Sequence, residues 1–240
     1  LGVQHKNFAM LFKACQAREV SGNRLNIWLY GPAGTGKTHA AHAVASALSL
    51  PFQSNGTMLT EYSLSGFIDA GGRYHRTAFR EIFEHGGVYL GDEYDAWDPK
   101  AAMYLQAALS NGYTRFPDGM VKRHSDAIII FGANTVGKGA TAEYSTRNKI
   151  DDANGNRMVY IPWPLDEALE LAISPDPKWT ARVQVMRSRV RERALKGHLI
   201  TPRQALQGAA LLQVGLEWEQ VEEMVLRRGL SDDHWESIRS

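Results

Sequence analysis

The segment "GPAGTGKT", Gly31 to Thr38, decides the fold because it fits the pattern G-x-x-x-x-G-K-[ST] in the context that this pattern requires. The apolar run "LNIWLY" before it is typical of a buried strand, and "KTHAAHAVASALSL" at its end is typical of a helix. Glycines let the backbone N–H groups of such a loop turn towards phosphate oxygens, and the helix dipole adds positive potential. We therefore predict a phosphate-binding loop that consists of Gly31, Pro32, Ala33, Gly34, Thr35, Gly36, Lys37 and Thr38.

A second motif, "GGVYLGDEYDAWDP" from Gly86 to Pro99, takes an apolar strand straight into Asp92 and Glu93. Burying an unpaired carboxylate is costly, so such acids usually serve a cation or a reaction. Beside a phosphate loop, Asp92 is expected to hold Mg²⁺ through water together with the Thr38 hydroxyl, while Lys37 reaches the β- and γ-phosphates. Glu93 is expected to orient and polarise the attacking water. These motifs predict an ATPase that uses ATP and Mg²⁺. Asp95 is interpreted as a cap of the following helix.

The composition is that of an ordinary globular protein, with 240 residues, 44% hydrophobic and 22% charged. The net charge of +1 argues against a protein that coats nucleic acid along its whole surface. Cys15 is the only cysteine, which excludes an intramolecular disulfide and favours a packing role. No apolar run approaches the roughly 20 residues of a membrane span, so we predict a cytoplasmic protein. The chain begins at Leu1 without Met, and we interpret it as trimmed, with an additional N-terminal domain missing from view.

The order of the predicted elements divides the chain into two parts. Strand patterns alternate with helix patterns as far as Pro164, and helix patterns dominate from Leu165 onward. This order predicts an α/β fold, a P-loop NTPase parallel sheet sandwiched by helices, followed by an all-helical C-terminal domain. The expected domains are residues 1–164, with a β-hairpin insertion near 111–125, and residues 165–240. Residues 56–74 are predicted to be a loop.

With these motifs in this order, the chain resembles the AAA+ ATPases from about Asn26 to Ile238. Within them it is similar to the MoxR group and to the ring-forming small subunit of cobaltochelatase, including phage-encoded relatives. "IIIFGANTVGKGA" resembles the sensor-1 strand, whose polar end residue, here Asn134, helps to position the attacking water. "HLITPRQALQGAALLQVG" resembles the helix of the C-terminal lid domain that carries the sensor-2 arginine. The resemblance implies that Arg203 approaches the γ-phosphate.

The resemblance also implies an arginine finger, which acts on the nucleotide of a neighbouring subunit. The family usually has Arg-Phe where this chain has Arg157-Met158, which makes Arg157 the candidate although the aromatic residue is lost. Arg147 is a rival for this role. In a third interpretation, Arg157 only pairs with a local acid such as Asp151 or Asp152.

Two further segments have open interpretations. Asn55, at the end of the second strand, is either a switch residue that restrains Glu93 or an ordinary turn residue. The loop "GFIDAGGRYHR" lies where related ATPases place the residues that line the ring pore, here Phe67, Arg73, Tyr74 and His75. A plain surface loop is the alternative.

We therefore expect a ring-forming ATPase, by family analogy a hexamer, whose subunits assemble head to tail and which remodels or loads a partner protein. A first alternative is a nucleic-acid motor or loader that uses a basic hairpin and the helix "RVQVMRSRVRERALKGH". Its hairpin residues would be Arg115, Lys122, Arg123 and His124. A second alternative is a nucleotide-gated switch that acts as a monomer and does not need Arg157 for hydrolysis.

Overall fold

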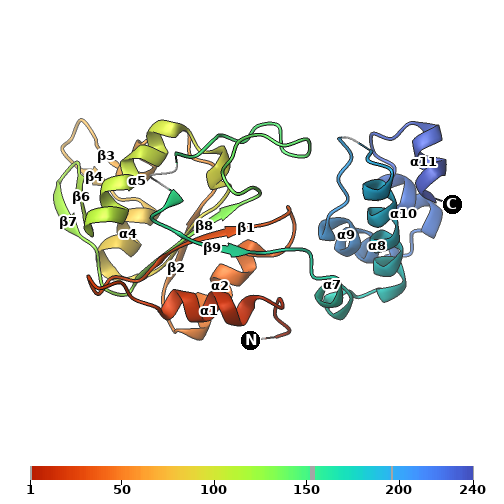
Figure 1. Ribbon diagram of the computed structural model, residues 1–240, viewed down its shortest axis with the longest axis horizontal. Helices are drawn as coiled ribbons and strands as arrows, with labels where there is room; N and C mark the ends of the chain where they lie inside the picture. The colour runs from red at the N-terminus through yellow and green to blue at the C-terminus, as the bar shows by residue number, and fades with distance from the viewer. Residues whose placement is uncertain (1, 152–154, 196, 240) are drawn as a thin grey trace.

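The computed structural model describes residues 2–151, 155–195 and 197–239, which form an α/β part followed by a group of helices (Figure 1). The α/β part comprises α1 (Phe8–Gln16), β1 (Asn26–Tyr30), α2 (Lys37–Ala47), β2 (Phe52–Asn55), α3 (Tyr62–Ser65), β3 (Phe67–Ile68), β4 (Tyr74–His75), α4 (Ala78–His85), β5 (Gly87–Gly91), the 3₁₀ helix η1 (Tyr94–Ala96), α5 (Pro99–Asn111), β6 (Tyr113–Phe116), β7 (Gly119–Lys122), β8 (Ala127–Ala133) and β9 (Val159–Pro162). The helices that follow are α7 (Glu167–Ile173), α8 (Pro177–Glu192), α9 (Pro202–Gln213), α10 (Trp218–Val225) and α11 (Asp232–Arg239).

The central sheet has five strands in the order β2-β5-β8-β1-β9, and every neighbouring pair is parallel. Its central strand, β8, is buried along its whole length. Strands covered on both faces are continuously apolar, which is why "AIIIFGA" shows no polar alternation. The predicted fold class is confirmed.

Alternate side chains of β1, β5 and β8 enter two different cores. Ile27 and Leu29 of β1 pack with α1 and α2, where the buried Cys15 also lies. Trp28, between them in sequence, points to the other face and packs with α4 and α5. The packing role predicted for Cys15 is confirmed. The carboxyl ends of all five strands lie at one edge of this sandwich, and the loops that follow β1, β5 and β8 meet there.

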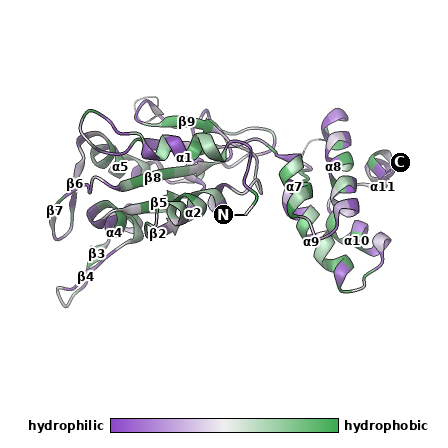
Figure 2. Ribbon diagram, turned by 90° about the horizontal axis from the view of Figure 1, so that it is seen from below, coloured by the Kyte–Doolittle hydropathy of each residue, from purple (hydrophilic) through white to green (hydrophobic). Residues whose placement is uncertain are grey.

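Two small hairpins project from the face that α4 and α5 cover. β6 and β7 pair antiparallel at the hairpin predicted near residues 111–125. Residues 56–74, predicted to be a loop, contain α3 and the start of a second hairpin, β3–β4, which extends away from the sheet in Figure 2. The Asp69 carboxylate closes the turn of this hairpin by accepting the N–H groups of Gly71 and Arg73, each at 2.9 Å. Strands of two residues are too short for their period to be read from sequence.

The C-terminal helices have an apolar core of their own, formed by residues of α8, α9, α10 and α11. Trp179 of α8 packs directly on Gly208 of α9, where an added Cβ would lie 2.1 Å from the indole. A buried ion pair joins α7 to α8, with Glu170 Oε1 2.5 Å from Arg187 Nη2 and Oε2 2.8 Å from Nη1. The described helices include none long and apolar enough to cross a membrane.

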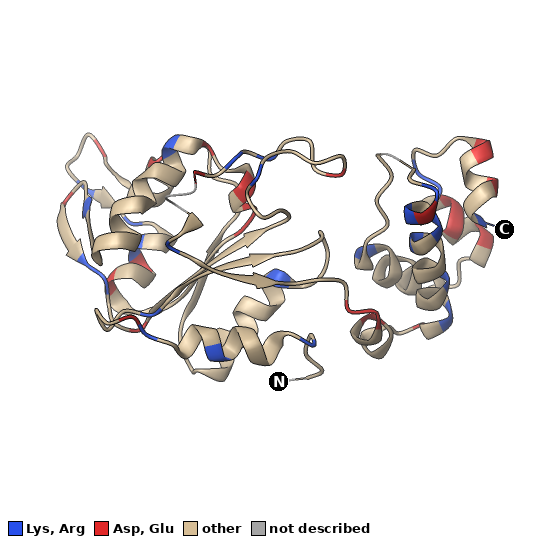
Figure 3. Ribbon diagram, in the orientation of Figure 1, with Lys and Arg blue, Asp and Glu red and all other residues tan. Residues whose placement is uncertain are grey.

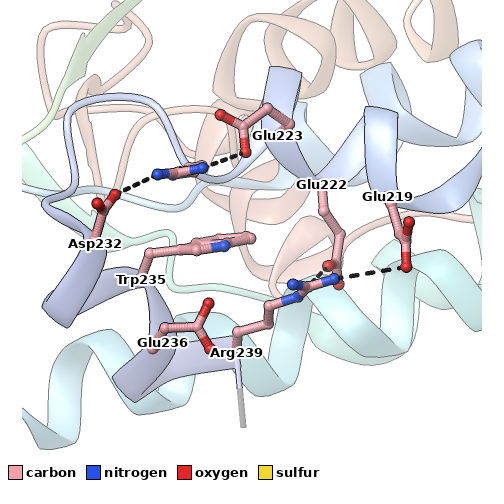
Figure 4. Close-up of a pocket in the computed structure, with 8 residues that line it drawn as sticks. Glu219, Glu222, Glu223, Asp232, Trp235, Glu236 and Arg239 are labelled. Carbon is pink, nitrogen blue, oxygen red and sulfur yellow. Dashed lines mark hydrogen bonds and ion pairs between the residues drawn. The ribbon is translucent and has the colours of Figure 1, made fainter.

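The outer side of these helices carries a strongly acidic pocket (Figure 4). Trp235 lies in it between two arginine-centred groups of ion pairs. Arg239 Nε is 3.1 Å from the buried Glu222, and Arg227 contacts both Glu223, at 2.9 Å, and Asp232. The pairs with Glu222 and Asp232 join α11 to α10 and the residues that follow it, so the pocket is explained by the packing of the helices.

Candidate functional site

The loop from Gly31 to Thr38 leads from β1 into α2 and depends on its glycines. Gly34 and Gly36 have φ angles of +77° and +84°, which other residues rarely adopt. An added Cβ on Gly31 would lie 1.9 Å from the Trp163 carbonyl oxygen, so only glycine allows this close approach. The indole N–H of Trp163 in turn donates to the Thr35 carbonyl oxygen at 3.1 Å. The residue after β9 therefore fixes the shape of the loop.

The Lys37 ammonium lies inside this loop and is only 7% exposed. It donates to the carbonyl oxygens of Gly31 at 2.7 Å and Pro32 at 2.9 Å, and to Asn134 Oδ1 at 3.1 Å. Burial lowers the pKa of Lys37 to about 8, and the positive charges of Arg203 and Arg147 act in the same direction, against Asp92 and Asp95. An anion placed here would restore the favourable environment of the ammonium.

Thr38 and Asp92 come from different elements and meet beside the loop. The Thr38 hydroxyl donates to Asp92 Oδ2 at 2.8 Å, and Asp92 Oδ1 accepts the Glu93 N–H at 2.9 Å. Gly132 of the neighbouring β8 leaves room for this carboxylate, because an added Cβ would lie 2.6 Å from Asp92 Oδ1. Thr38 is exposed to solvent, and a hydroxyl beside a carboxylate fits the oxygen ligands that Mg²⁺ prefers.

Glu93 is held in an uncommon conformation directly after this carboxylate. Its φ angle of +51° is left-handed, which costs energy for a residue with a side chain and is frequent at functional sites. Its carboxylate is half exposed, and Oε2 accepts a hydrogen bond from the Thr57 hydroxyl at 2.8 Å. Asn55 contacts this segment through its backbone, since its carbonyl oxygen accepts the Asp92 N–H. The side-chain oxygen, Asn55 Oδ1, is buried without a hydrogen-bond partner among the described residues. The side chain that restrains Glu93 in this structure is Thr57, and the switch interpretation of Asn55 is not supported by a contact.

The interpretation of Asp95 as a helix cap is wrong. Asp98 caps α5, since its side chain accepts the Lys100 N–H at 2.8 Å. Asp95 is fully buried, and Oδ2 accepts the Asn134 and Thr135 N–H groups at 3.1 and 2.9 Å. It therefore fixes the end of β8, from which Asn134 reaches Lys37.

Arg203 and Arg147 approach the loop from two other directions. Arg203 lies in the first turn of α9, two residues after the capping Thr201. The Arg203 Cγ atom lies 3.3 Å from the position of an added Cβ on Gly34. Arg147 lies in the loop between β8 and β9, with Nε 3.4 Å from Asp95 Oδ1 and Nη2 3.9 Å from Glu93 Oε1. Both arginines thus lie beside the phosphate loop or the acidic segment of their own chain.

Arg157 lies far from these residues in the fold. It precedes β9, at the amino-terminal edge of the sheet, and its carbonyl oxygen accepts the side-chain N–H of Asn26 at the start of β1, at 3.2 Å. Its Nε donates to the Ser110 hydroxyl at the end of α5. The phosphate loop lies at the opposite, carboxyl-terminal edge. Of the two acids considered as local partners of Arg157, Asp152 lies outside the described residues.

A pocket of about 460 Å³ opens beside the phosphate loop, and the sequence did not reveal it. The N-terminal segment, α7 and α9 line it together with the loop, and its wall is mainly apolar. The His5 ring stacks on Trp163 with their centroids 4.0 Å apart, and His5 Nε2 lies 2.8 Å from the Pro164 carbonyl oxygen. These residues are more than 150 positions apart, so no local pattern could have paired them.

The residues considered for pore lining divide into two groups. Phe67, Arg73 and His75 are exposed on the β3–β4 hairpin, where His75 stacks on Phe67. Tyr74 is anchored instead, because its hydroxyl donates to the Ser65 carbonyl oxygen at 2.6 Å and the Arg80 guanidinium covers its ring.

The basic residues considered for nucleic-acid binding are partly unavailable. Arg123 is only 3% exposed and donates to Asn26 Oδ1 at 2.9 Å, so its inclusion among the binding residues was wrong. Arg187 of the basic helix is buried against Glu170, and Arg182 donates to Glu222 at 2.8 Å. Arg115, Lys122 and His124 remain exposed on the hairpin and beyond it.

The model of the "ATPase family associated with various cellular activities (AAA)" matches residues 27–148, half of the chain. This chain belongs to the AAA family. The match includes the phosphate loop, Asp92, Glu93 and Asn134. A search of curated proteins finds no match.

Solved structures share the fold of this AAA protein. NtrX from Brucella abortus aligns at 20% identity with a TM-score of 0.52, covering 96% of this chain and 52% of that one. Two RuvB mutants from Thermotoga maritima align at 16% and 14% identity with TM-scores of 0.58 and 0.55. They cover 96% and 97% of this chain and 73% and 67% of the RuvB chains. This AAA protein thus spans about half of the NtrX chain. At these identities the likeness concerns the fold alone.

Proposed function

We propose that this AAA protein is a Mg²⁺-dependent ATPase whose active site is completed by a second copy of the chain. The observation that carries the ATPase proposal is the meeting of Thr38 and Asp92 at 2.8 Å, beside the buried Lys37 ammonium. A metal-binding hydroxyl and carboxylate next to a phosphate-binding cation suit the charge distribution of a nucleoside triphosphate.

The residues then divide the chemistry among them. Lys37 and the N–H groups of the loop bind the phosphates, and Thr38 and Asp92 hold Mg²⁺, which neutralises charge on the phosphate oxygens. Glu93 accepts a proton from the attacking water, which Asn134 helps to position. Arg203 contacts the γ-phosphate, and the pocket between His5, Trp163 and α7 receives the base because it is apolar and adjoins the loop.

The position of Arg157 supports a shared site. It lies at the amino-terminal edge of the sheet while the phosphate loop lies at the carboxyl-terminal edge, so it cannot serve the nucleotide of its own subunit. A head-to-tail contact brings such opposite edges of two copies together, and repetition closes a ring. We propose Arg157 as the finger in trans and a ring, as a hexamer, as the assembly. Arg147 lies in its own subunit's site, which disfavours it for the trans role.

We further propose that residues 1–164 are the large domain and 165–240 the lid, because the C-terminal helices have their own core. Movement of Arg203 with the lid would couple hydrolysis to a hinge motion that acts on a partner protein. We place the chain near the MoxR and cobaltochelatase small-subunit group. The exposed Phe67, Arg73 and His75 are proposed to line the pore.

The first experiment measures ATP hydrolysis per subunit over a wide range of protein concentration, for the wild type and Arg157→Ala. The proposal expects specific activity to rise with concentration in the wild type and to stay low in the variant. Activity independent of concentration, with normal hydrolysis by Arg157→Ala, would support the monomeric switch instead.

A further inference from the structure

The loop between β8 and β9 is fastened onto the active site of its own subunit at several points. The Asn148 N–H donates to the Asp95 carbonyl oxygen, and the Asn148 side chain donates to the Trp97 carbonyl oxygen, each at 2.7 Å. On the other side of the site, the Tyr144 hydroxyl accepts the Ala33 N–H of the phosphate loop at 2.9 Å. Residues 144–148 therefore bridge from the phosphate loop to the acidic segment after β5.

Arg147 lies in the middle of this bridge. Its side chain is only 11% exposed, and its guanidinium carbon is 5.8 Å from the centroid of the Tyr144 ring. Figure 3 shows positively charged residues of this loop close to the acidic segment that follows β5. The carboxylates that Arg147 faces are the buried Asp95 at 3.4 Å and Glu93 at 3.9 Å.

These ion pairs are incomplete. Arg147 Nε and Asp95 Oδ1 are both buried and have no hydrogen-bond partner within the described part of the chain, although they lie 3.4 Å apart. An arginine fully engaged with a carboxylate normally forms two short, parallel hydrogen bonds. The guanidinium thus lies near carboxylate charge without the paired hydrogen bonds that would fix its orientation, so a small rotation can turn it towards another oxygen group.

A second observation shows where such a group would lie. Lys37 donates to Asn134 Oδ1 at 3.1 Å, and the Asn134 N–H donates to the same Asp95 carboxylate that Arg147 faces. Arg203 Cγ lies beside Gly34 of the phosphate loop, and the Tyr144 hydroxyl next to Arg147 accepts the Ala33 N–H of that loop. The three cations are therefore gathered around the phosphate loop, where the terminal phosphate of a nucleoside triphosphate would attract all of them.

We propose that Arg147 binds the γ-phosphate of its own subunit's nucleotide, and that without nucleotide it is stored between Asp95 and Glu93. This inference rests on the proposed ATPase function. On binding ATP, the guanidinium turns from Glu93 towards the γ-phosphate, which leaves the Glu93 carboxylate available for the attacking water. Because Asn148 and Tyr144 are hydrogen-bonded to the site of their own subunit, Arg147 between them acts on the nucleotide of that same subunit. Release of the γ-phosphate returns the arginine to Glu93.

The first test compares ATPγS and ADP binding by Arg147→Met, which keeps side-chain length and removes the charge. We expect ATPγS affinity to fall about tenfold or more, as for loss of a charged hydrogen bond, and ADP affinity to change less than about twofold. Retained ADP binding shows that the variant is folded. Lys149→Met, an exposed lysine of the same loop, is the matched control and should bind both nucleotides normally. An equal loss for both nucleotides, or no loss, overturns the proposal.

The second test mixes inactive subunits. If Arg147 acts in cis, a mixture of Arg147→Met and Lys37→Ala subunits stays inactive, because no subunit then contains both Lys37 and Arg147. Recovery of ATPase activity in this mixture would place Arg147 in trans and overturn the proposal.

The proposed function is tested separately in the same experiment. Subunits with Arg157→Ala and Lys37→Ala should recover activity when mixed. If this mixture stays inactive while Arg147→Met loses only ATPγS binding, the proposal of an active site shared between subunits is wrong and the inference on Arg147 is supported. A wild type that binds neither nucleotide overturns both.

Discussion

The Thr57 hydroxyl donates a hydrogen bond to Glu93 Oε2 across 2.8 Å, between the segment after β2 and the end of β5. A residue of the segment that follows the neighbouring strand β2 therefore restrains the carboxylate that is proposed to activate water. Since β2 lies at the edge of the sheet beside β5, a partner that displaces the segment after β2 would also release Glu93.

Replacing Thr57 with alanine removes this restraint. A hydrogen bond to a charged group contributes roughly 1.5 kcal/mol, so we expect basal kcat to rise by up to about tenfold. Steady-state ATP hydrolysis measures the change, and Thr57→Ser, which keeps the hydroxyl, should behave as the wild type. A kcat that is unchanged or lower in Thr57→Ala would contradict a restraining role.

Replacing Glu93 with glutamine keeps the shape of the side chain and removes its basicity. We expect kcat to fall about 10²- to 10⁴-fold, the usual contribution of general base catalysis, while ATP still binds. Single-turnover hydrolysis and equilibrium binding separate the two effects. Glu143→Gln, an exposed glutamate in the loop between β8 and β9, is the control and should keep its activity. Hydrolysis by Glu93→Gln near the wild-type rate would assign the base elsewhere.

The lowered pKa of Lys37, about 8, predicts how nucleotide binding depends on pH. Only the ammonium form binds phosphate, and above pH 8 the free protein has largely lost this proton. ATP affinity should therefore fall as the pH rises through about 8, and binding near pH 9 should take up close to one proton. Calorimetry in buffers of different ionisation enthalpy measures this uptake. Binding without proton uptake near pH 9 would show that Lys37 keeps an ordinary pKa.

The buried Glu170–Arg187 pair predicts a stability effect in the C-terminal helices. Breaking it with Glu170→Leu leaves the buried guanidinium with only the half-exposed Glu167 carboxylate at 3.7 Å, which should lower the free energy of unfolding by about 3–5 kcal/mol. The double variant Glu170→Leu/Arg187→Met removes both charges and should recover most of this loss. Denaturant unfolding followed by tryptophan fluorescence measures both.

The control for this pair is Glu167→Gln. Glu167 is half exposed and 3.7 Å from the same arginine, so its removal should cost less than about 1 kcal/mol. Equal losses for the Glu167 and Glu170 variants would mean that burial does not set the strength of the pair.

Some residues of the proposed nucleotide site could be predicted from short sequence patterns, and others could not. The phosphate loop, Asp92, Glu93 and Asn134 could be predicted because each lies at the end of a strongly apolar strand, and the carboxyl ends of parallel strands meet. Thr57 could not, since it follows a four-residue edge strand whose pattern is weak. The switch interpretation of Asn55 depends on its position at the end of β2, but the register with β5 turns its backbone, and not its side chain, towards Asp92.

For Asp95 and Arg123 the prediction was wrong because residue type and local position indicate a surface role for a residue that is buried. Asp95 precedes a helix and resembles a cap, yet it is fully buried where it orders the end of β8. Arg123 follows a hairpin and resembles a surface cation, yet it donates to residues at the starts of β1 and β8. In both cases the partners lie far away in the sequence.

The sequence alone determined the class of the fold and the chemistry of its central loop, because glycine spacing, apolar runs and strand-end acids act over a few residues. Only the tertiary structure decided which side chains complete the site. His5 meets Trp163, Tyr144 meets Ala33, and Arg147 lies in cis while Arg157 lies at the far edge of the sheet. Such contacts depend on how strands and loops are ordered in space, and no short-range pattern encodes that order.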